Sequence, residues 1–440
     1  MGNKANNTPL SKEGTTSVSL AYGRGRLSIE VPTTNTTVIE PAFIPGLIDE
    51  RAAIRNAINV PLGSPPLRDI VKPGQSVAIS ICDNTRPMPN QTVLPVLLEE
   101  LSKTPGLEII ILVATGTHRA ATTEELLEMV GDDIVNNYEL INHDAFDRTT
   151  LCQQSNAEPN LPVWLNRRWV EADVRITTGF VEPHFFAGFS GGPKMVAPGL
   201  AGFDTTMRLH DAGMIGAPNA RWGVTVGNPI HDAIRQIAKQ SGVHFSIDVA
   251  INRNREITSV HAGDLFMVHE IMCEIVKRTA MQSCNKPFDV VLTTNSGYPL
   301  DQNLYQAIKG ISAAAQVVKD NGVILCAAEC ADGLPSHGAF GDILSSQPDP
   351  ELLLKMINKP GHNRHDQWQV QIQAQIQRKA KIFLKTEGLS NMEVKAAHLT
   401  PIDNIEATIY EQLRRIGNNA SLCVLPEGPQ TIPYLDQARR

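Results

Sequence analysis

Short apolar runs rich in valine and isoleucine alternate along the chain with longer stretches in which apolar residues recur at helical spacing. This rhythm is typical of strand–helix–strand units, whose strands form a parallel sheet with helices on its faces. We therefore predict an α/β protein with largely parallel sheets. The predicted strands are 76–81, 107–113, 174–178, 289–294, 322–327 and 422–425, and the predicted helices include 94–102, 123–130, 231–240 and 304–318.

The pattern divides the chain into two α/β domains. A polar head over residues 1–17 is predicted to be disordered, because it has too few apolar residues to build a core. A second strand–helix series begins near Asn285, after a helical stretch at 266–281. We place the N-terminal domain at 18–284 and the C-terminal domain at 285–440, with the option that the C-terminal tail packs back on the first domain.

Charge and composition narrow the classes of partner. The net charge of −7 is spread along the 440 residues, and there is no basic stripe with interleaved aromatic residues, which argues against nucleic acid. The seven cysteines lack the dense spacing of disulfide scaffolds. Neither a signal-like segment nor a membrane-length apolar run is present. We therefore expect a cytoplasmic protein without a membrane partner.

Four of the predicted strands run into loops that carry polar residues. In open parallel sheets, ligands bind beyond the carboxyl ends of the strands, so chemistry is expected in these loops. The loop sequences, in chain order, are C-D-N-T-R-P-M-P-N, A-T-G-T-H-R, G-F-V-E-P-H-F-F-A-G-F-S-G-G-P-K and N-S-G-Y-P-L-D-Q-N-L-Y-Q-A-I-K-G.

The first three loops hold four candidate side chains. Asp83 and Arg86 lie three apart in a proline-rich turn, where the arginine could grip a carboxylate or phosphate; the alternative is an Asx turn with a surface arginine. His118 and His184 each follow a turn and could act as general bases near neutral pH. The alternative for each histidine is a solvated or capping residue.

The third loop ends in a glycine-rich turn. Gly191 and Gly192 follow Ser190 and precede Pro193 and Lys194, so the backbone could approach a ligand closely and offer N–H donors to a phosphate. The turn matches neither the Walker A motif nor the dinucleotide fingerprint. Lys194 is therefore either a surface residue or a reactive amine held against a bound nucleotide.

Metal-ligating residues are sparse in this region. His210 has only Asp211 and His231 as its nearest companions of ligand type, and no H-E-x-x-H or cysteine cluster accompanies them. A protein that supplies one imidazole holds a catalytic metal only when another molecule supplies the remaining donors.

Further candidates lie in the C-terminal half of the chain. Gln306 and Lys309 share one face at the start of a predicted helix, where they could address one anion, or they form a solvated face. Trp368 could wall a pocket or simply pack in a core. Other candidates for a pocket lining are Phe185, Phe186, Tyr298 and Tyr305.

Taken together, these segments resemble the nickel-dependent lactate racemase family, and the resemblance extends over residues 76–368. It implies that His118 and His184 are the two acid–base residues, that Lys194 forms a covalent link to the cofactor, and that His210 is the nickel ligand. It further implies cofactor contacts by Asp83, Ser190, Gly191 and Gly192, and substrate contacts by Arg86, Tyr305, Gln306, Lys309 and Trp368.

The resemblance also implies a cofactor and a reaction. The cofactor is a nickel-pincer nucleotide, a pyridinium mononucleotide with two sulfur-containing substituents that bind nickel through sulfur, carbon and sulfur. With His210, these donors would complete a square-planar set suited to Ni(II). The reaction is racemisation or epimerisation of a small, lactate-like 2-hydroxy acid by hydride transfer through a 2-keto acid. The active site is expected in the cleft between the two domains, and separate enzymes would supply the cofactor.

Two other functions stay open from the sequence. One is a nicotinamide-type dehydrogenase or a hydratase on an α/β scaffold, although the missing dinucleotide fingerprint argues against the dehydrogenase. The other is a carrier of a nucleotide or of nickel, which would need neither His118 nor His184.

Overall fold

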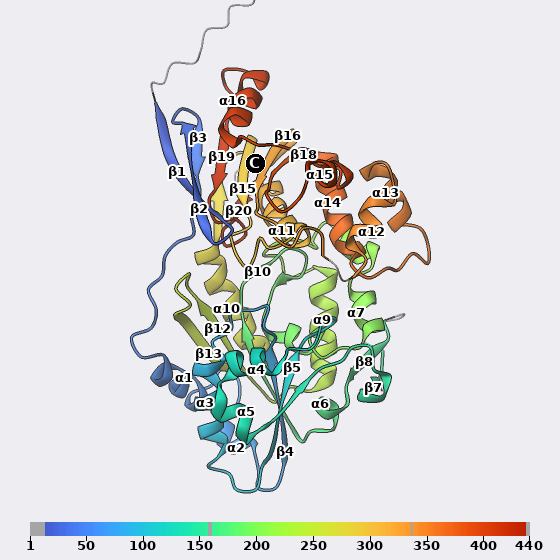
Figure 1. The fold of residues 1–440 in the computed structure, drawn as a ribbon. Coiled ribbons are helices and arrows are strands. Elements are labelled where there is room, and N and C mark those ends of the chain that lie inside the picture. Colours follow the sequence, from blue (N-terminus) through green and yellow to red (C-terminus); the bar gives the residue numbers. More distant parts are fainter. Residues whose placement is uncertain (1–13, 157–160, 336–337, 437–440) are drawn as a thin grey trace, which may run out of the picture. The chain divides into compact units, whose positions relative to one another are not determined.

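The computed structural model describes residues 14–156, 161–335 and 338–436 (Figure 1). The chain forms two compact units, of which unit 1 comprises Met1–Glu40, Gln282–Lys355 and Ile372–Arg440, and unit 2 comprises Pro41–Met281 and Met356–Gln371. The sequence division at 284 therefore lies close to one of the points where the chain passes between units. The predicted division differs from the observed units in two places. The segment that ends at Glu40 belongs to unit 1, and residues 356–371 belong to unit 2.

Unit 2 is built on a six-stranded sheet in the order β13-β12-β9-β4-β5-β6. All neighbours pair in parallel except β12 and β13, which are antiparallel and joined by a short turn. The sequence prediction found β4, β5 and β9 and missed the three others. The strands are β4 (Ser76–Cys82), β5 (Glu108–Ala114), β6 (Glu139–Asn142), β9 (Val174–Phe180), β12 (Phe245–Ile251) and β13 (Ile257–Gly263).

The remaining elements of unit 2 are helices and two short antiparallel pairs, β7 with β8 and β10 with β11. The pairs are β7 (Leu151–Gln154), β8 (Val163–Asn166), β10 (Pro183–His184) and β11 (Gly188–Phe189). The helices are α1 (Glu50–Asn59), α2 (Leu67–Ile70), α3 (Asn90–Leu101), α4 (Thr123–Val130), α5 (Asp132–Asn137), α6 (Arg167–Glu171), α7 (Phe203–Leu209), α8 (Ala212–Ile215), α9 (Pro229–Ser241) and α10 (Leu265–Ala280), with 3-10 turns η1 (Arg148–Thr150) and η2 (Gly192–Met195).

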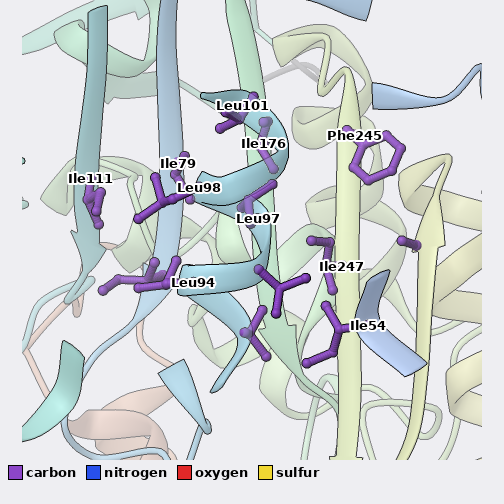
Figure 2. Packing of buried hydrophobic residues seen from close by; sticks show 14 of the residues in the cluster. Ile54, Ile79, Leu94, Leu97, Leu98, Leu101, Ile111, Ile176, Phe245 and Ile247 are labelled. Atoms are coloured by element: carbon purple, nitrogen blue, oxygen red, sulfur yellow. The ribbon is translucent and has the colours of Figure 1, made fainter. Parts of the chain in front are cut away.

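Alternation along β4 shows how the sheet separates core from site. Ile79 is buried in a hydrophobic cluster with Leu94 and Leu97 of α3 and Ile54 of α1 (Figure 2). Because successive side chains of a strand point to opposite faces, the next residue, Ser80, faces the other side, where its hydroxyl donates to the carbonyl of Met195 in η2, 2.8 Å away. One face of the sheet is thus an apolar core, and the other supports the glycine-rich turn.

Unit 1 has a second six-stranded sheet, in the order β18-β17-β16-β15-β19-β3, and all its pairs are parallel. Its strands are β3 (Thr36–Val38), β15 (Phe288–Thr294), β16 (Val318–Ala327), β17 (Ala380–Lys385), β18 (Thr400–Pro401) and β19 (Leu422–Leu425), and β14 (Met281–Cys284) pairs with β20 (Ile432–Leu435). The helices that lie wholly or partly in this unit are α11 (Leu304–Ala315), α12 (Phe340–Ser345), α13 (Pro350–Ile357), α14 (Gln367–Lys379), α15 (Asn391–Ala396) and α16 (Ile405–Ile416).

Residues 1–13 of the predicted polar head, 1–17, lie outside the described part of the chain. Thr15–Ser17 of that segment belong to β1 (Thr15–Tyr22), which forms an antiparallel hairpin with β2 (Gly25–Pro32). Val18 and Leu20 of this hairpin are buried in one cluster with Val290 of β15. The apolar residues that would not sustain a core locally are therefore buried by strands far away in the sequence.

The fold class predicted from the sequence is confirmed, and most of the predicted boundaries shift by only a few residues. The largest shifts are at the starts of α3 and β16, which each begin four residues earlier than predicted, and α11 ends at Ala315 because Val318 already begins β16. Within the described ranges, no helix combines the length and the apolar character needed to cross a bilayer.

Candidate active site

Three predicted loops of unit 2 leave neighbouring parallel strands at the same edge of the sheet. Asp83 directly follows β4, His118 lies in the loop after β5, and His184 and Lys194 lie in the segment after β9. Since β9, β4 and β5 are adjacent and parallel, their carboxyl ends meet at this edge. This is the position where open α/β sheets bind ligands.

Asp83 and His118 form a hydrogen-bonded pair. The Nδ1 atom of His118 lies 2.7 Å from Oδ2 of Asp83, and Thr85 donates its hydroxyl to Oδ1 at 2.7 Å. Burial raises the pKa of the Asp83 carboxyl, but the hydrogen bond and the charge of His118 outweigh burial and leave this pKa below its usual value. An ionised Asp83 accepts the Nδ1 proton of His118, so in the neutral ring the lone pair lies on Nε2.

Arg86 makes an ion pair that the sequence reasoning did not anticipate. Its guanidinium lies 3.6 Å from Oε1 of Glu182, the glutamate of E-P-H-F-F. The backbone N–H of Arg86 donates to the carbonyl of Asp83, so the D-x-x-R segment is also a turn. The sequence reasoning did not select Glu182, although its position two residues before His184 could have marked it as a candidate.

His184 is buried among aromatic rings. Its ring centroid lies 4.9 Å from that of Phe185 and 4.5 Å from that of Phe186. The backbone N–H of Ala187 donates to Nδ1 at 3.2 Å, so the neutral ring carries its proton on Nε2. His118 and His184 therefore differ in tautomer: one offers a lone pair at Nε2, and the other offers a proton there.

Several polar groups of the glycine-rich turn form hydrogen bonds to other groups of the protein. The hydroxyl of Ser190 donates to the carbonyl of Phe180 at 2.7 Å and accepts from the N–H of Glu182 at 2.9 Å. The N–H of Gly192 donates to Asp248 at 3.2 Å, and that of Lys194 donates to the carbonyl of Gly191. These particular donors bond within the protein, and the predicted contact of the turn with a phosphate stays a prediction.

Lys194 itself is half-buried in η2. Its ammonium lies 5.9 Å from the centre of the Phe186 ring, within cation–π range. The same charge lowers the pKa of the buried imidazoles of His210 and His231. Lys194 is thus directed into unit 2 rather than into bulk water.

His210, the predicted nickel ligand, is a buried, neutral histidine with one ring nitrogen bonded to the backbone. It caps the C-terminal end of α7, and its Nδ1 donates to the carbonyl of Thr206 at 2.7 Å, which leaves the lone pair on Nε2. Burial lowers the pKa of His210 to about 4, so the ring is neutral at neutral pH. The ring of Trp368 lies 4.7 Å from that of His210, which places the predicted pocket tryptophan beside the predicted nickel ligand.

The described residues do not by themselves form a complete metal site at His210. Among the described residues, no group of three or more histidine, cysteine, aspartate or glutamate side chains is arranged to hold a metal. Asp211 pairs with Arg208 and caps α8. A metal bound at His210 would therefore need further donors from another molecule.

The other predicted substrate contacts lie in unit 1. Tyr305, Gln306 and Lys309 are half-buried on the first turns of α11, which follows the carboxyl end of β15. The ring of Tyr305 packs against Phe340 at 5.4 Å. Because residues three and four apart share a helix face, the three side chains form one group.

We expect unit 2 to lose stability in acid. Burial lowers the pKa of His210 and His231 to about 4 and that of His269 to about 3, from 6.5. The unfolded chain therefore binds more protons below pH 6.5, and stability that is present above pH 6.5 is lost as the pH falls toward 4. Between pH 7 and pH 4.5, the free energy of unfolding should fall by about 2–3 kcal/mol less in His210→Gln than in the natural chain, because glutamine does not titrate. Thermal unfolding at the two pH values measures this, and an equal loss in both proteins would contradict it.

Comparison with known proteins agrees with this description. The architecture is that of α/β enzymes that place their chemistry beyond the carboxyl ends of parallel strands. The lactate racemase N-terminal domain matches residues 22–223, and the lactate racemase C-terminal domain matches residues 283–432. The chain belongs to the lactate racemase family.

Individual relatives match over nearly the whole chain. The lactate racemase of Thermoanaerobacterium thermosaccharolyticum is 33% identical over 421 residues, which cover 94% of this chain and 98% of that protein. The lactate racemase of Lactiplantibacillus plantarum is 32% identical, with coverage of 93% and 98%. These matches confirm the family and the enzyme class, an isomerase, that the sequence predicted.

Solved structures give the same result for the fold. The lactate racemase apoprotein of T. thermosaccharolyticum superposes with a TM-score of 0.89 at 32% identity and covers 95% of this chain and 100% of that one. A protein from Thermotoga maritima has a TM-score of 0.66 at 19% identity, with coverage of 90% and 100%, which shows a shared fold.

Proposed function

We propose that this chain inverts the configuration of lactate or a close 2-hydroxy acid. The observation that carries the proposal is that unit 2 bears the Asp83–His118 pair, His184 and Lys194 on one sheet edge, in a chain whose relatives at 32–33% identity are lactate racemases. Inversion needs proton-handling groups for both enantiomers, and two histidines meet that need when one accepts a proton as the neutral ring and the other donates one as the imidazolium.

The residues fit a nickel-pincer nucleotide. Lys194 would carry the nucleotide through its amine, and Nε2 of His210 would bind the nickel, since Nδ1 is occupied by Thr206. Asp83, Ser190, Gly191 and Gly192 would lie near the nucleotide, through side-chain or backbone contacts. When bound, the cofactor supplies an acceptor that takes hydride from C2 of the substrate and returns it. Separate synthesis enzymes would deliver the cofactor.

The protein's own groups would handle the hydroxyl proton. Nε2 of His118 accepts it, and Asp83 stabilises the imidazolium that results. His184 would return a proton to the substrate oxygen as an imidazolium, with protons on both nitrogens, so its Nδ1 has to give up the hydrogen bond from the N–H of Ala187. The turnover would leave His118 protonated and His184 neutral, and for the opposite enantiomer the two rings exchange these roles.

Cationic and aromatic groups would hold the substrate. Arg86, Lys309 and Gln306 are proposed to bind the carboxylate, with Glu182 fixing the guanidinium of Arg86. Tyr305 and Trp368 would line the pocket. Holding the 2-keto acid in place lets it accept hydride on its other face before it escapes. That the site lies between the two domains stays a prediction.

Isotope labelling tests the reaction. Lactate deuterated at C2 should be racemised with the label retained in the inverted product, because the hydrogen leaves C2 as hydride and does not exchange with water. Mass spectrometry of the separated enantiomers measures this. Loss of label to water at the rate of inversion would instead show a carbanion intermediate and would overturn the hydride proposal.

A further inference from the structure

Three buried titratable side chains converge on one backbone segment, residues 187–192, which lies between His184 and Lys194. They come from three different elements: His231 from α9, Asp248 from β12 and His269 from α10. Each acts on the backbone of a different residue of this segment. Nε2 of His269 lies 2.9 Å from the carbonyl of Ser190, and Oδ1 of Asp248 accepts the N–H of Gly192 at 3.2 Å. The imidazole of His231 interacts with the backbone of Ala187, which raises the pKa of His231 against the larger effect of burial.

Two glycines allow this close approach. A Cβ atom on Gly192, whose φ is +47°, would lie 2.4 Å from Cγ of His269, and a Cβ atom on Gly179 would lie 2.2 Å from Oδ1 of Asp248. Both distances are far below van der Waals contact. The glycine in the strand T-T-G-F and the second glycine of S-G-G-P-K therefore make room for the two side chains, in addition to any part in ligand binding.

The two histidines act as neutral hydrogen-bonding partners. A carbonyl only accepts, so Nε2 of His269 is the donor to Ser190, and burial holds the pKa of His269 at about 3. Burial likewise lowers the pKa of His231 to about 4. Burial raises the pKa of Asp248 to about 7, while the hydrogen bond from Gly192 lowers it. Nearby, Lys194 is a positively charged neighbour of both histidines.

We propose that His231, Asp248 and His269 are positioning residues that fix segment 187–192 and thereby hold Lys194 in the orientation in which it takes up its nucleotide. This inference rests on the proposed function, in which Lys194 carries the cofactor. A turn with two consecutive glycines at positive φ samples many conformations when unrestrained. A covalent link forms efficiently only when the amine is held against its partner, so a clamp on the turn serves attachment directly.

Hydrogen exchange and mass analysis of matched variants test the clamp. Asp248→Leu removes the acceptor for the N–H of Gly192, whereas Asp248→Asn keeps an acceptor oxygen of the same reach. In protein without cofactor, amide exchange across 187–194 should become about tenfold faster in Asp248→Leu, as expected for the loss of one buried hydrogen bond, and should stay near the natural rate in Asp248→Asn. His269→Leu should also accelerate exchange.

The cofactor then gives a second readout. In protein produced with the synthesis enzymes, the fraction carrying the adduct should fall at least fivefold in Asp248→Leu and be retained in Asp248→Asn. His143→Leu is the matched control, because His143 is also a buried histidine of unit 2 and bonds a carbonyl, that of Ala201 at 2.9 Å, outside the segment. It should change neither measurement.

The outcomes separate the clamp from the proposed function. Unchanged exchange in both leucine variants, or faster exchange with full adduct, would overturn the positioning role. So would equal adduct loss in the leucine and asparagine variants. Absence of any adduct on the natural chain would overturn the proposed tether, and exchange would then still decide by itself whether the three residues hold the segment.

Discussion

Lys194→Ala should abolish the nucleotide-sized mass adduct and reduce racemisation to background. Lys194 is half-buried in η2 and directed into unit 2, beside the ring of Phe186. A tether through its amine is the only attachment that this substitution removes. Intact-mass analysis of the natural chain and the variant, each produced with the cofactor-synthesis enzymes, measures the adduct.

His210→Ala provides the matched comparison. Because the tether and the metal bond are separate attachments, this variant should keep the adduct and lose nickel, as measured by metal analysis of the same preparations. An undiminished adduct in Lys194→Ala would exclude this lysine. Full nickel occupancy in His210→Ala would show that another residue, such as His231, is the ligand.

Replacement of either His118 or His184 by glutamine should suppress racemisation in both directions, by about 10²- to 10⁴-fold. One turnover removes the hydroxyl proton for one enantiomer and restores it for the other, so each histidine takes part in each direction. Initial rates from pure L- and pure D-lactate, read by chiral chromatography, measure the effect.

His261→Gln is the control for this pair, because His261 lies on edge strand β13, away from the loops after β4, β5 and β9. It should keep the natural rate in both directions. If a histidine variant lost racemisation in only one direction at equal substrate saturation, a reversible cycle that uses both histidine rings would be contradicted. Full activity without His184 would assign acid–base work to His118 alone.

Much of the fold and the location of the candidate site could be predicted from local sequence. The apolar runs of β4, β5, β9 and β15 are buried on both faces of parallel sheets, so each stands out without any knowledge of its neighbours. The polar loops that follow them then have to gather at the carboxyl edge. His118, His184 and Lys194 could be selected for this reason.

Tertiary structure decided what the local pattern does not contain. The hairpin β1–β2 was not among the predicted strands, and its buried residues pack against strands more than 250 residues away in the sequence. The pairing of His118 with Asp83, of Arg86 with Glu182 and of Gly192 with Asp248 joins residues 35, 96 and 56 positions apart.

The same holds for protonation. The sequence by itself determined which residues can carry charge or bind a metal, because that is a property of each side chain. Which nitrogen of His118, His184 or His210 holds the proton depends on the group that each ring meets, a carboxylate, a backbone N–H or a carbonyl. Hydrogen bonds are short and directional, so these partners, and with them the tautomers, are set only once the chain has folded.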